Sequence, residues 1–406
     1  MNSDNNNNTP RLRFPEFSGK WEEKKLGDSF EERTERNYSQ LPLLSLGEKG
    51  LFFQIETERK DNSNADKSKY LRVAIGDITY NTMRMWQGRC VYAGIEGIVS
   101  PAYTVCKPKA DIDSLFHYYL FKTHRMIQVF HQHSQGLVSD TLNLKYDAFA
   151  KIKYLLPPSL TEQEKIASFM SSMDDVIVEQ EQKIEDLKEK KKGLMQQMFP
   201  QPGQATPQLR FPWFNGEWEE KKFREITFSA GKKNKQNLPY ERYSISNESG
   251  FFPQNDLFEG GGGYLKDINC SMYTIVSPKS FAYNPARINV GSIGYQNLDK
   301  DVIVSSLYEV FKTTDACDDA FLWQWFHSGA FHKMVVEVQE GGVRQYFFYN
   351  KLQECKIHLP SLPEQQKIAE CLSALDKQIA AESAKVDALK DHKKGLMQQL
   401  FPHPSK

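Results

Sequence analysis

The feature that most constrains this chain is a long internal repeat. The seven residues KKGLMQQ occur at 191–197 and again at 393–399, and the similarity extends without insertion over 160–200 and 362–402. A period of 202 residues is far longer than the repeats of solenoid proteins, so the chain is a tandem duplication of a large unit. Segments that keep their length between two otherwise diverged copies are expected to have a geometric role.

A second repeated block opens each half of the chain. LRFPEFSGKWEEKK begins at Leu12 and LRFPWFNGEWEEKK begins at Leu209, and the sequences that follow these blocks diverge strongly. With 406 residues, the chain is also too long for one ordinary core. The predicted segments are a disordered tail (1–10), a first variable domain (11–157), a central spacer helix (158–200), a linker (201–207), a second variable domain (208–358), a C-terminal spacer helix (359–402) and a tail (403–406).

Each fixed segment has the pattern of a long helix. Apolar residues alternate at spacings of four and three from Ile166 to Met198 and from Ile368 to Leu400, which forms a sustained heptad seam. An S-x-x-E capping box precedes each seam, and a Phe-Pro pair follows it. We therefore expect two helices of about 37 residues, roughly 55 Å long, that pair as an antiparallel coiled coil within the chain.

Polar residues interrupt the two seams at Gln180, Lys191, Glu382 and Lys393. Such residues set register and orientation in coiled coils. An antiparallel alignment in which Lys191 faces Glu382 also places Gln180 against Lys393, whereas a parallel alignment in register opposes two lysines. We predict this antiparallel register. The alternative is two separate helices, each packed on its own domain.

Glycine interrupts both helices near their C-terminal ends, at Gly193 and Gly395. A glycine inside a helix costs about 1 kcal/mol relative to alanine. We expect the close approach of another backbone, from a domain or from a partner subunit, to explain both positions. Simple fraying of the helix ends is the alternative.

The variable domains combine short strands with helices. Runs such as VAIGDITYN and DVIVSSLYEVFK have the β-branched and aromatic content of strands, and 115–133 and 320–338 have helical patterns. The predicted fold class is α+β: two similar domains joined by two long helices in an antiparallel intramolecular coiled coil, with pseudo-twofold symmetry. Because the formal net charge is zero, nucleic-acid binding would need a local basic face.

Sequence motifs of catalysis and of membrane insertion are not found. The chain has no Walker motif, no His-Glu-x-x-His and no Gly-x-Ser-x-Gly, and no apolar run of about eighteen residues. Its six cysteines form no Cys-x-x-Cys pair, which favours reduced thiols in a cytoplasmic protein over a disulfide framework or a zinc site. We therefore predict a chain without an active site, a metal or a cofactor of its own.

Basic and amide side chains recur beside aromatic residues in the variable domains. Arginine and glutamine can read the edges of guanine and adenine, and lysine can contact phosphate. A solvated surface without a ligand is the alternative for each cluster. The candidate DNA contacts are Asn81, Arg84, Gln87, Arg89, Lys232, Lys233, Lys235, Asn284, Arg287, Arg344 and Gln345.

The repeated motifs together resemble those of a known family. PSL-x-EQ-x-KIA leads each heptad helix, KKGLMQQ-x-F-P ends it, and LRFP-x-F-x-G-x-WEEKK opens each half. This doubled pattern is similar to the specificity (S) subunit of type I restriction–modification systems, over essentially the whole chain after the first ten residues. YNTMRMWQG at 80–88, followed by GIVSPAY at 97–103, also resembles one class of that family's recognition domain.

The resemblance implies a non-catalytic, sequence-specific DNA-binding subunit. Each variable domain would be a target-recognition domain that reads one half of a bipartite site in double-stranded DNA, and the spacer helices would fix the gap and dock two methyltransferase (M) subunits. S-adenosylmethionine would bind to the M subunits, and ATP with Mg²⁺ to separate restriction or motor (R) subunits, which complete an adenine methyltransferase and endonuclease complex. No membrane partner is implied. The alternatives are a structural adaptor that presents two protein-binding domains on a coiled-coil spacer, and a self-sufficient nuclease or methyltransferase.

Overall fold

The chain forms two compact units, each containing one variable domain and parts of both long helices. Unit 1 comprises residues 1–181 and 384–406, and unit 2 comprises residues 182–383. The computed structural model describes residues 8–47, 50–56, 66–136, 138, 141–201, 203–246, 250–254, 269–339 and 346–402. The predicted tail at 403–406 and most of the predicted tail at 1–10 lie outside these ranges.

The domain of unit 1 is built on a four-stranded antiparallel sheet in the order β2-β9-β6-β7, with the pairs β1-β10, β3-β4 and β5-β8. The apolar and β-branched runs of the sequence supply the buried strands, such as β8, in which every residue is buried. The elements are β1 (Glu22–Lys25), α1 (Leu26–Ser29), β2 (Phe30–Glu32), β3 (Leu44–Gly47), β4 (Gly50–Phe53), η1 (Gln54–Glu56), β5 (Leu71–Val73), β6 (Ile78–Asn81), η2 (Met85–Gln87), β7 (Cys90–Tyr92), β8 (Gly97–Val99), β9 (Tyr103–Pro108), α2 (Ser114–Phe121), α3 (His124–His133), α4 (Tyr146–Phe149) and β10 (Lys153–Leu156).

The domain of unit 2 repeats this plan. Its four-stranded sheet has the order β12-β20-β17-β18, and β11 pairs with β21 as β1 pairs with β10. The elements are β11 (Glu219–Lys222), α6 (Phe223–Ile226), β12 (Thr227–Ser229), β13 (Lys232–Lys233), β14 (Tyr243–Ser246), β15 (Gly250–Pro253), β16 (Thr274–Val276), β17 (Ser280–Tyr283), η5 (Ile288–Val290), β18 (Ile293–Gln296), β19 (Val302–Val304), β20 (Glu309–Thr313), α7 (Asp319–Phe326), α8 (Gly329–Gln339), α9 (Tyr349–Glu354) and β21 (Lys356–Leu359).

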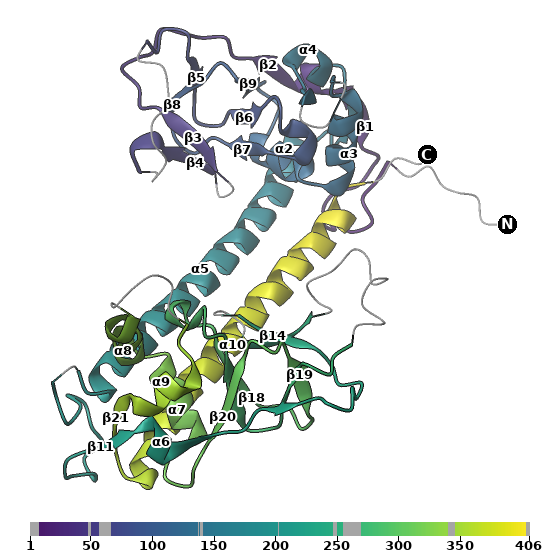
Figure 1. The fold of residues 1–406 in the computed structure, drawn as a ribbon. Coiled ribbons are helices and arrows are strands. Elements are labelled where there is room, and N and C mark those ends of the chain that lie inside the picture. Colours follow the sequence, from purple (N-terminus) through teal and green to yellow (C-terminus); the bar gives the residue numbers. More distant parts are fainter. Residues whose placement is uncertain are drawn as a thin grey trace. The chain divides into compact units, whose positions relative to one another are not determined.

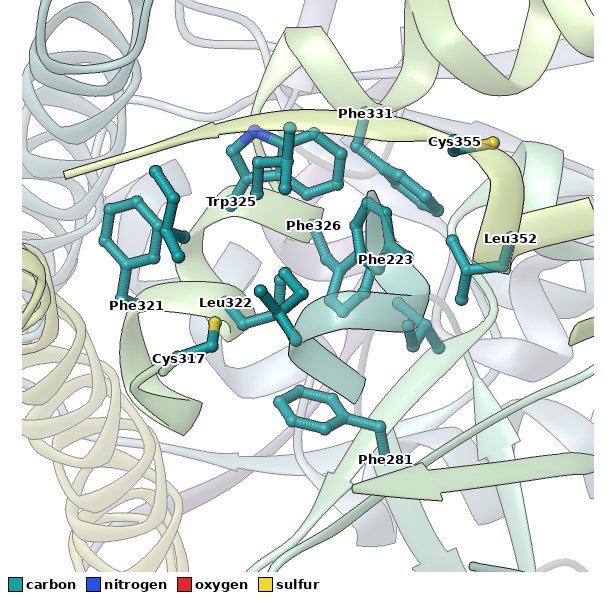
Figure 2. Packing of buried hydrophobic residues seen from close by; sticks show 14 of the residues in the cluster. Phe223, Phe281, Cys317, Phe321, Leu322, Trp325, Phe326, Phe331, Leu352 and Cys355 are labelled. Atoms are coloured by element: carbon teal, nitrogen blue, oxygen red, sulfur yellow. The ribbon is translucent and has the colours of Figure 1, made fainter. Parts of the chain in front are cut away.

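Each domain core also takes in the long helices. In unit 2, Phe199 from the end of one helix and Ile368 from the start of the other belong to the same buried cluster as Phe326. Figure 2 shows the aromatic residues of this cluster around Phe326. In unit 1, Ile166 and Phe401 have the equivalent places. Burial of one such side chain contributes about 1.5–3 kcal/mol, so the helices are integral parts of the domains.

The long helices α5 (Leu160–Met198) and α10 (Leu362–Leu400) contain 39 residues each. Within each unit they lie antiparallel (Figure 1), because the partners of successive residues on α5 occur in descending order on α10. The interhelical ion pairs are Asp174–Lys393 and Glu181–Lys390 in unit 1, and Lys183–Glu382 and Lys191–Asp376 in unit 2. The predicted α+β class, with two similar domains and antiparallel helices, is confirmed.

The predicted register of these helices is wrong. The Lys191 ammonium lies 2.6 Å from a carboxylate oxygen of Asp376, which precedes the predicted partner Glu382 by six residues. Likewise, Lys393 forms its ion pair with Asp174, which precedes the predicted partner Gln180 by six residues. Heptad seams displaced by about one repeat bury the same apolar stripe, so periodicity alone does not select among them.

The glycine prediction is corrected in part. A Cβ built on Gly193 or on Gly395 would meet no other atom of the described chain within 4 Å. Close approach of one of the chain's own described domains therefore does not explain these glycines. Approach of a partner subunit and fraying of the helix ends are the two explanations that remain.

Candidate nucleic-acid interface

The loop that follows β6 has a backbone fixed by its own hydrogen bonds. The side-chain oxygen of Asn81 accepts a hydrogen bond of 2.9 Å from the Met83 amide, and the Arg84 amide donates to the Asn81 carbonyl at 2.9 Å. The single turn η2 follows and ends at Gly88, whose φ of 73° favours glycine. A Cβ at Gly88 would also lie 2.8 Å from the side chain of Ile127. We call residues 81–89 the first-domain loop.

Side-chain packing attaches this loop to α3. The Trp86 indole nitrogen donates to the Met83 carbonyl at 3.0 Å, and the indole ring lies edge-on to His131 with 5.7 Å between ring centroids. Met85 is fully buried. The remaining long side chains of the loop, Arg84 and Gln87 among them, are exposed. The loop is therefore a rigid support for exposed polar side chains.

The first-domain loop borders a pocket of about 590 Å³. Three cationic residues line it, Arg84, Arg89 and Lys122, and its described lining contains no carboxylate. Neither guanidinium group has a hydrogen-bond or ion-pair partner among the residues that the structure describes. Unpaired guanidinium groups around an open pocket are suited to an anionic ligand such as a phosphate, or to the acceptor edge of a base.

Unit 2 contains the same loop with different side chains. The Asn284 side-chain oxygen accepts from the Ala286 amide at 3.0 Å, and the Arg287 amide donates to the Asn284 carbonyl at 2.9 Å. The turn η5 then ends at Gly291, with a φ of 83°. We call residues 284–292 the second-domain loop; each of its positions corresponds to the residue 203 places earlier in the first-domain loop.

A second pocket, of about 480 Å³, borders the second-domain loop. Asn284 and Lys233 line it, and the Lys233 ammonium is held by the Thr274 hydroxyl at 3.0 Å. The rings of Tyr346 and Phe348 stack at its edge, with 5.5 Å between centroids and 22° between planes. This pocket is therefore more aromatic and less cationic than the pocket of unit 1.

The structure brings some of the predicted DNA contacts together and separates others. In unit 1, all four predicted residues, Asn81, Arg84, Gln87 and Arg89, line one pocket. In unit 2, Lys233 and Asn284 share a pocket, and Arg287 is exposed on the adjacent loop. Arg344 and Gln345 lie outside the described residues. Whether any of these side chains contacts DNA stays a prediction.

The basic run Lys232–Lys235 does not form a single face. Lys232 and Lys233 are consecutive residues of β13, so their side chains point to opposite sides of the strand. Asn234 is buried, and its side-chain amide binds the backbone of Leu238 through both of its polar atoms. Lys235 is exposed. Lys233 is therefore the member of this run that faces the pocket.

Sequence reasoning missed the residues that attach each long helix to its domain. In unit 1, Arg13 of the LRFP block donates two hydrogen bonds, of 2.8 and 2.7 Å, to the buried Glu162 carboxylate at the start of α5. In unit 2, Arg210 and Glu364 form the same bidentate pair, at 2.6 and 2.8 Å. These pairs could have been suspected from the sequence, because the arginine and the glutamate are each identical in the two copies and belong to repeated motifs.

The acids at the edge of the helix seam were missed as well. Besides its ion pair with Lys393, Asp174 accepts a hydrogen bond of 2.7 Å from the Tyr119 hydroxyl of α2. In unit 2, Asp376 accepts from Gln324 of α7 at 2.8 Å in addition to its ion pair with Lys191. Each acid thus joins its domain to the opposite helix, which helps to explain why the register differs from the seam-based prediction.

Features of other functional classes are not found in the described part of the chain. No group of three or more His, Cys, Asp or Glu side chains that could hold a metal ion occurs among the described residues. Likewise, none of the described helices is both long enough and apolar enough to span a membrane.

Comparison with known proteins gives consistent results. The family model described as the type I restriction modification DNA specificity domain matches residues 18–189 and 215–391. The type I restriction enzyme MjaVIII specificity subunit of Methanocaldococcus jannaschii is 26% identical over 365 residues, which cover 82% of each chain. The putative type I restriction enzyme MjaX specificity subunit of the same organism is 24% identical over 364 residues, 84% of this chain and 81% of that protein.

Solved structures have the same fold. A chain from a study of complex assembly and conformational transition of the type I R-M system has a TM-score of 0.58 at 15% identity, covering 97% of this chain and all of that one. The type I restriction–modification S subunit from M. genitalium has a TM-score of 0.56 at 13% identity, with coverage of 98% and 100%. The family match extends over most of the chain and includes both domains, so this protein belongs to the family of type I restriction–modification specificity (S) subunits.

Proposed function

We propose that this chain selects the DNA target of a type I restriction–modification complex. Each domain reads one half of a bipartite sequence in duplex DNA, and the reaction is carried out by partner subunits. The observation that carries the proposal is the pair of loops at 81–89 and 284–292, which have matching backbone hydrogen bonds and different exposed side chains. Two similar supports with different side chains are what a chain needs to read two dissimilar half-sites.

The long helices are proposed to set the gap between the half-sites. A helix of 39 residues is roughly 58 Å long at 1.5 Å per residue, while half-sites one helical turn apart are separated by about 34 Å. Each helix is fixed to a domain by an arginine–glutamate pair whose carboxylate is buried, so a change in the length of the helix should be transmitted to the DNA-reading domain.

The repeated helix ends are proposed to dock two copies of the same methyltransferase subunit. In unit 1, Lys394 and Met397 of α10 border a pocket of about 880 Å³ that β10 and α3 also line. In unit 2, Pro200 and Gln201, just after α5, border a pocket of about 750 Å³ that β21 and α8 also line. Two similar pockets formed by duplicated segments suit two identical partners, and Gly193 and Gly395 lie close to these helix ends.

The proposed complex divides recognition from chemistry. S-adenosylmethionine belongs on the methyltransferase subunits, and ATP with Mg²⁺ belongs on the restriction or motor subunits. The S chain contributes the contacts to DNA and the positions of its partners. Because the net charge of the chain is zero, we expect weak DNA binding by the chain alone and strong, salt-dependent binding once the partners add their own contacts.

The test is methylome sequencing of cells that express this chain with its methyltransferase partner. We expect one bipartite motif with a fixed gap. Insertion of four residues after Leu187 and four after Leu389, about one helical turn each, should change the gap and preserve both half-sites. An unchanged gap would contradict the role of the helices, and a methylome without a bipartite motif would contradict the proposed function.

The structural-adaptor alternative makes a different prediction. A protein-binding adaptor would show no sequence preference in duplex DNA after the methyltransferase partner is added. Fluorescence anisotropy with the methylome-derived duplex and a scrambled duplex, over a range of salt concentrations, separates the two functions.

A further inference from the structure

The side chains that surround the two DNA-reading loops differ mainly in one chemical direction, with the exposed Met83 of the first-domain loop, which corresponds to Ala286, as the exception. This comparison rests on the proposed function, and it concerns how each domain distinguishes bases. The two loops have equivalent backbones, so equivalent positions can be compared directly.

One exposed side chain is shared by both loops. Arg84 and Arg287 occupy the same position at the start of the single turn, with φ values of −129° and −132°. Both are exposed, and neither guanidinium group has a partner among the described residues. A side chain that is the same in both domains cannot account for a difference between their targets, whereas a guanidinium group suits the phosphate that every sequence offers.

The neighbouring positions of the loops differ in polarity. The exposed Gln87 of the first-domain loop corresponds to Val290, which is 57% exposed. The exposed Arg89 corresponds to Ser292, which is buried and donates its hydroxyl to the Ile245 carbonyl at 3.2 Å. The first-domain loop therefore offers an amide and a guanidinium group where the second-domain loop offers an exposed isopropyl group.

The segment beside each loop differs in the same way. The Leu144 amide donates to the Thr82 carbonyl in unit 1, and the Phe347 amide donates to the Pro285 carbonyl in unit 2, so the two segments are equivalent. Flanking positions Asn143 and Lys145 of the first segment correspond to Tyr346 and Phe348 of the second. The latter two rings are stacked on each other and are 53% and 46% exposed.

A third position follows the same trend. The amides of Tyr103 and Tyr308 donate to the carbonyls of Ser100 and Ser305, which makes Ala102 and Leu307 equivalent. Leu307 is 68% exposed and lines the pocket of unit 2. Several large apolar side chains exposed around one loop indicate a binding surface.

We propose that the first domain reads the edges of purines, while the second domain reads a thymine methyl group. In the first domain, Arg89 can donate to the N7 and O6 acceptors of guanine, and Gln87 can donate to N7 and accept from the N6 amino group of adenine. In the second domain, Leu307 and Phe348 line one pocket beside the loop, and Val290 is exposed on the loop itself; these apolar side chains fit the C5-methyl of thymine. Arg84 and Arg287 contact the phosphate backbone in both.

The charges of the two pockets agree with this assignment. Three cationic residues and no carboxylate line the described pocket of unit 1, whereas Lys233 is offset by Glu309 in the pocket of unit 2. The cationic pocket of unit 1 suits the acceptor atoms of purine edges. The pocket of unit 2, in which Lys233 is offset by Glu309, is compatible with an uncharged methyl group.

The decisive test replaces thymine by deoxyuridine, which removes only the C5-methyl group. The full chain with its methyltransferase partner is titrated with duplexes that carry the substitution in either half-site of the methylome-derived target. We expect deoxyuridine at one position of the second-domain half-site to weaken binding about fourfold, the effect of losing contact with one methyl group. The same replacement in the first-domain half-site should have no effect, whereas 7-deazapurines there should weaken binding.

Substitutions assign each half-site to its domain. Val290→Gln and Phe348→Lys introduce the side chains of the first domain and should abolish the discrimination between thymine and deoxyuridine. Arg287→Gln is the matched control: it should weaken binding to all sequences alike, lower the salt dependence, and preserve the discrimination. Because single variants can lose their fold, helicity and thermal unfolding are compared with those of the wild type.

Three results would overturn the inference while leaving the proposed function intact. The first is tolerance of deoxyuridine at every thymine of a correctly bound bipartite site, and the second is the absence of thymine from the second-domain half-site. The third is an unchanged target in the Val290→Gln and Phe348→Lys variants. Failure of the wild-type complex to prefer any bipartite duplex would overturn the proposed function together with the inference.

Discussion

The two domains share a backbone plan but have different interiors. In unit 1, the buried His117 lies between the Asp113 carbonyl, 2.7 Å from Nδ1, and the Tyr154 hydroxyl, 2.9 Å from Nε2. Tyr154 also bonds to Ser29. At the equivalent positions of α7, β21 and α6, unit 2 has the apolar residues Leu322, Ile357 and Ile226, all of which are buried.

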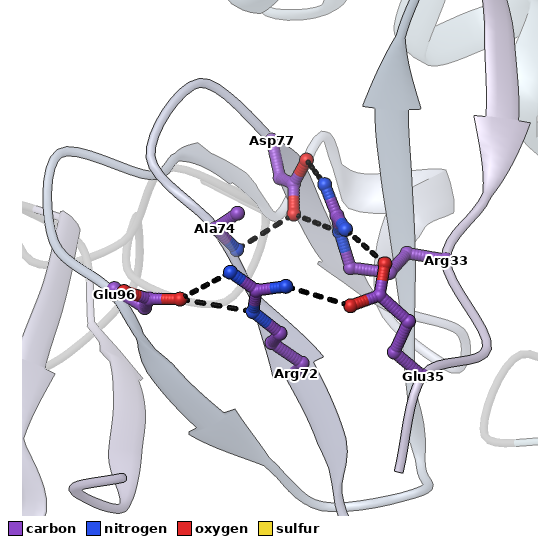
Figure 3. A network of polar contacts seen from close by, with 6 residues as sticks. All are labelled: Arg33, Glu35, Arg72, Ala74, Asp77 and Glu96. Carbon is purple, nitrogen blue, oxygen red and sulfur yellow. Dashed lines mark hydrogen bonds and ion pairs between the residues drawn. The ribbon is translucent and has the colours of Figure 1, made fainter. Parts of the chain in front are cut away.

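A second polar group distinguishes the domains near their central sheets. In unit 1, the partly buried Arg33 donates to the buried Asp77 carboxylate at 2.7 and 3.0 Å, in a network that continues through Glu35 to Arg72 (Figure 3). Burial raises the pKa of Asp77 despite these bonds. Unit 2 has Ala230 and Ser280 at the positions of Arg33 and Asp77.

The comparison shows which features a duplicated fold must keep. The order of the four-stranded sheet, the turn after β6 or β17 and the attachment of the long helices are the same in both units. The smaller sheets differ: β16 pairs with both β13 and β19 in unit 2, and β5 and β8 form a two-stranded sheet in unit 1. Buried polar clusters differ, since a group of hydrogen-bonded residues can be exchanged for apolar ones when all its members change together. The shared features thus fix the position of the loop on each domain, and the buried polar clusters differ in how they stabilise each domain.

The largest expected effect concerns the Arg33–Asp77 pair. Arg33→Ala should destabilise unit 1 by about 3–5 kcal/mol, because it leaves a buried carboxylate without its cation. Arg33→Ala with Asp77→Ser introduces the residues of unit 2 and should cost less than about 2 kcal/mol. Urea unfolding, with hydrogen exchange to follow each unit separately, measures both. Equal losses of unfolding free energy in the single and double variants would show that Arg33 and Asp77 do not act as a coupled pair.

The buried histidine should make unit 1 sensitive to acid. Burial lowers the pKa of His117 to about 4, from an ordinary value of 6.5. Protonation therefore favours the unfolded state: the stability contribution is complete above pH 6.5 and decreases as the pH falls toward 4, by roughly 3 kcal/mol in total. His117→Leu, which copies Leu322, should remove this dependence. A pH profile of unit 1 that is identical in the wild type and the variant would contradict the assignment.

The two arginine–glutamate pairs that attach the long helices should differ by a smaller amount in their contribution to stability. Glu162 also accepts a hydrogen bond of 3.2 Å from the Trp21 indole, whereas the buried Trp218 indole nitrogen of unit 2 has no partner among the described residues. Arg13→Ala and Arg210→Ala should both be strongly destabilising. The loss should be greater for Arg210→Ala by about 1 kcal/mol, since Glu364 lacks the bond from tryptophan. The thermal unfolding midpoints of the two variants show which substitution costs more stability.

The smallest effect is expected at the helix glycines. Gly193→Ala and Gly395→Ala should each stabilise the chain by up to about 1 kcal/mol, because alanine is the better helix former and the added methyl group has free space. If a partner backbone approaches there, the same substitutions should weaken assembly with the methyltransferase subunit, measured by analytical ultracentrifugation. Lys192→Ala, on the neighbouring exposed surface of α5, is the control. Unchanged assembly of the glycine variants would favour fraying of the helix ends as the explanation.

Several elements could be predicted from the sequence because their signals are local. The helices around Ile177 and Ile379 follow from a heptad pattern, and the S-x-x-E motifs and Phe-Pro pairs mark their ends. The predicted capping-box role of the glutamates differs in the structure, where Glu162 and Glu364 bind arginine side chains. The duplication itself indicated that Asn81 and Asn284, with Arg84 and Arg287, belong to equivalent places. In the structure, both asparagines use their side-chain oxygens to shape the turn, which one sequence pattern does not distinguish from a direct contact with a base.

The sequence by itself determined the two-domain duplication, the α+β class and the two long antiparallel helices, since these depend on periodicities and repeats that are read along the chain. Only the tertiary structure decided the helix register, the Arg13–Glu162 and Arg210–Glu364 attachments, and the apolar surroundings of the second-domain loop. Those features join residues far apart in the sequence, and a heptad pattern is compatible with several registers until the domains fix the ends of the helices.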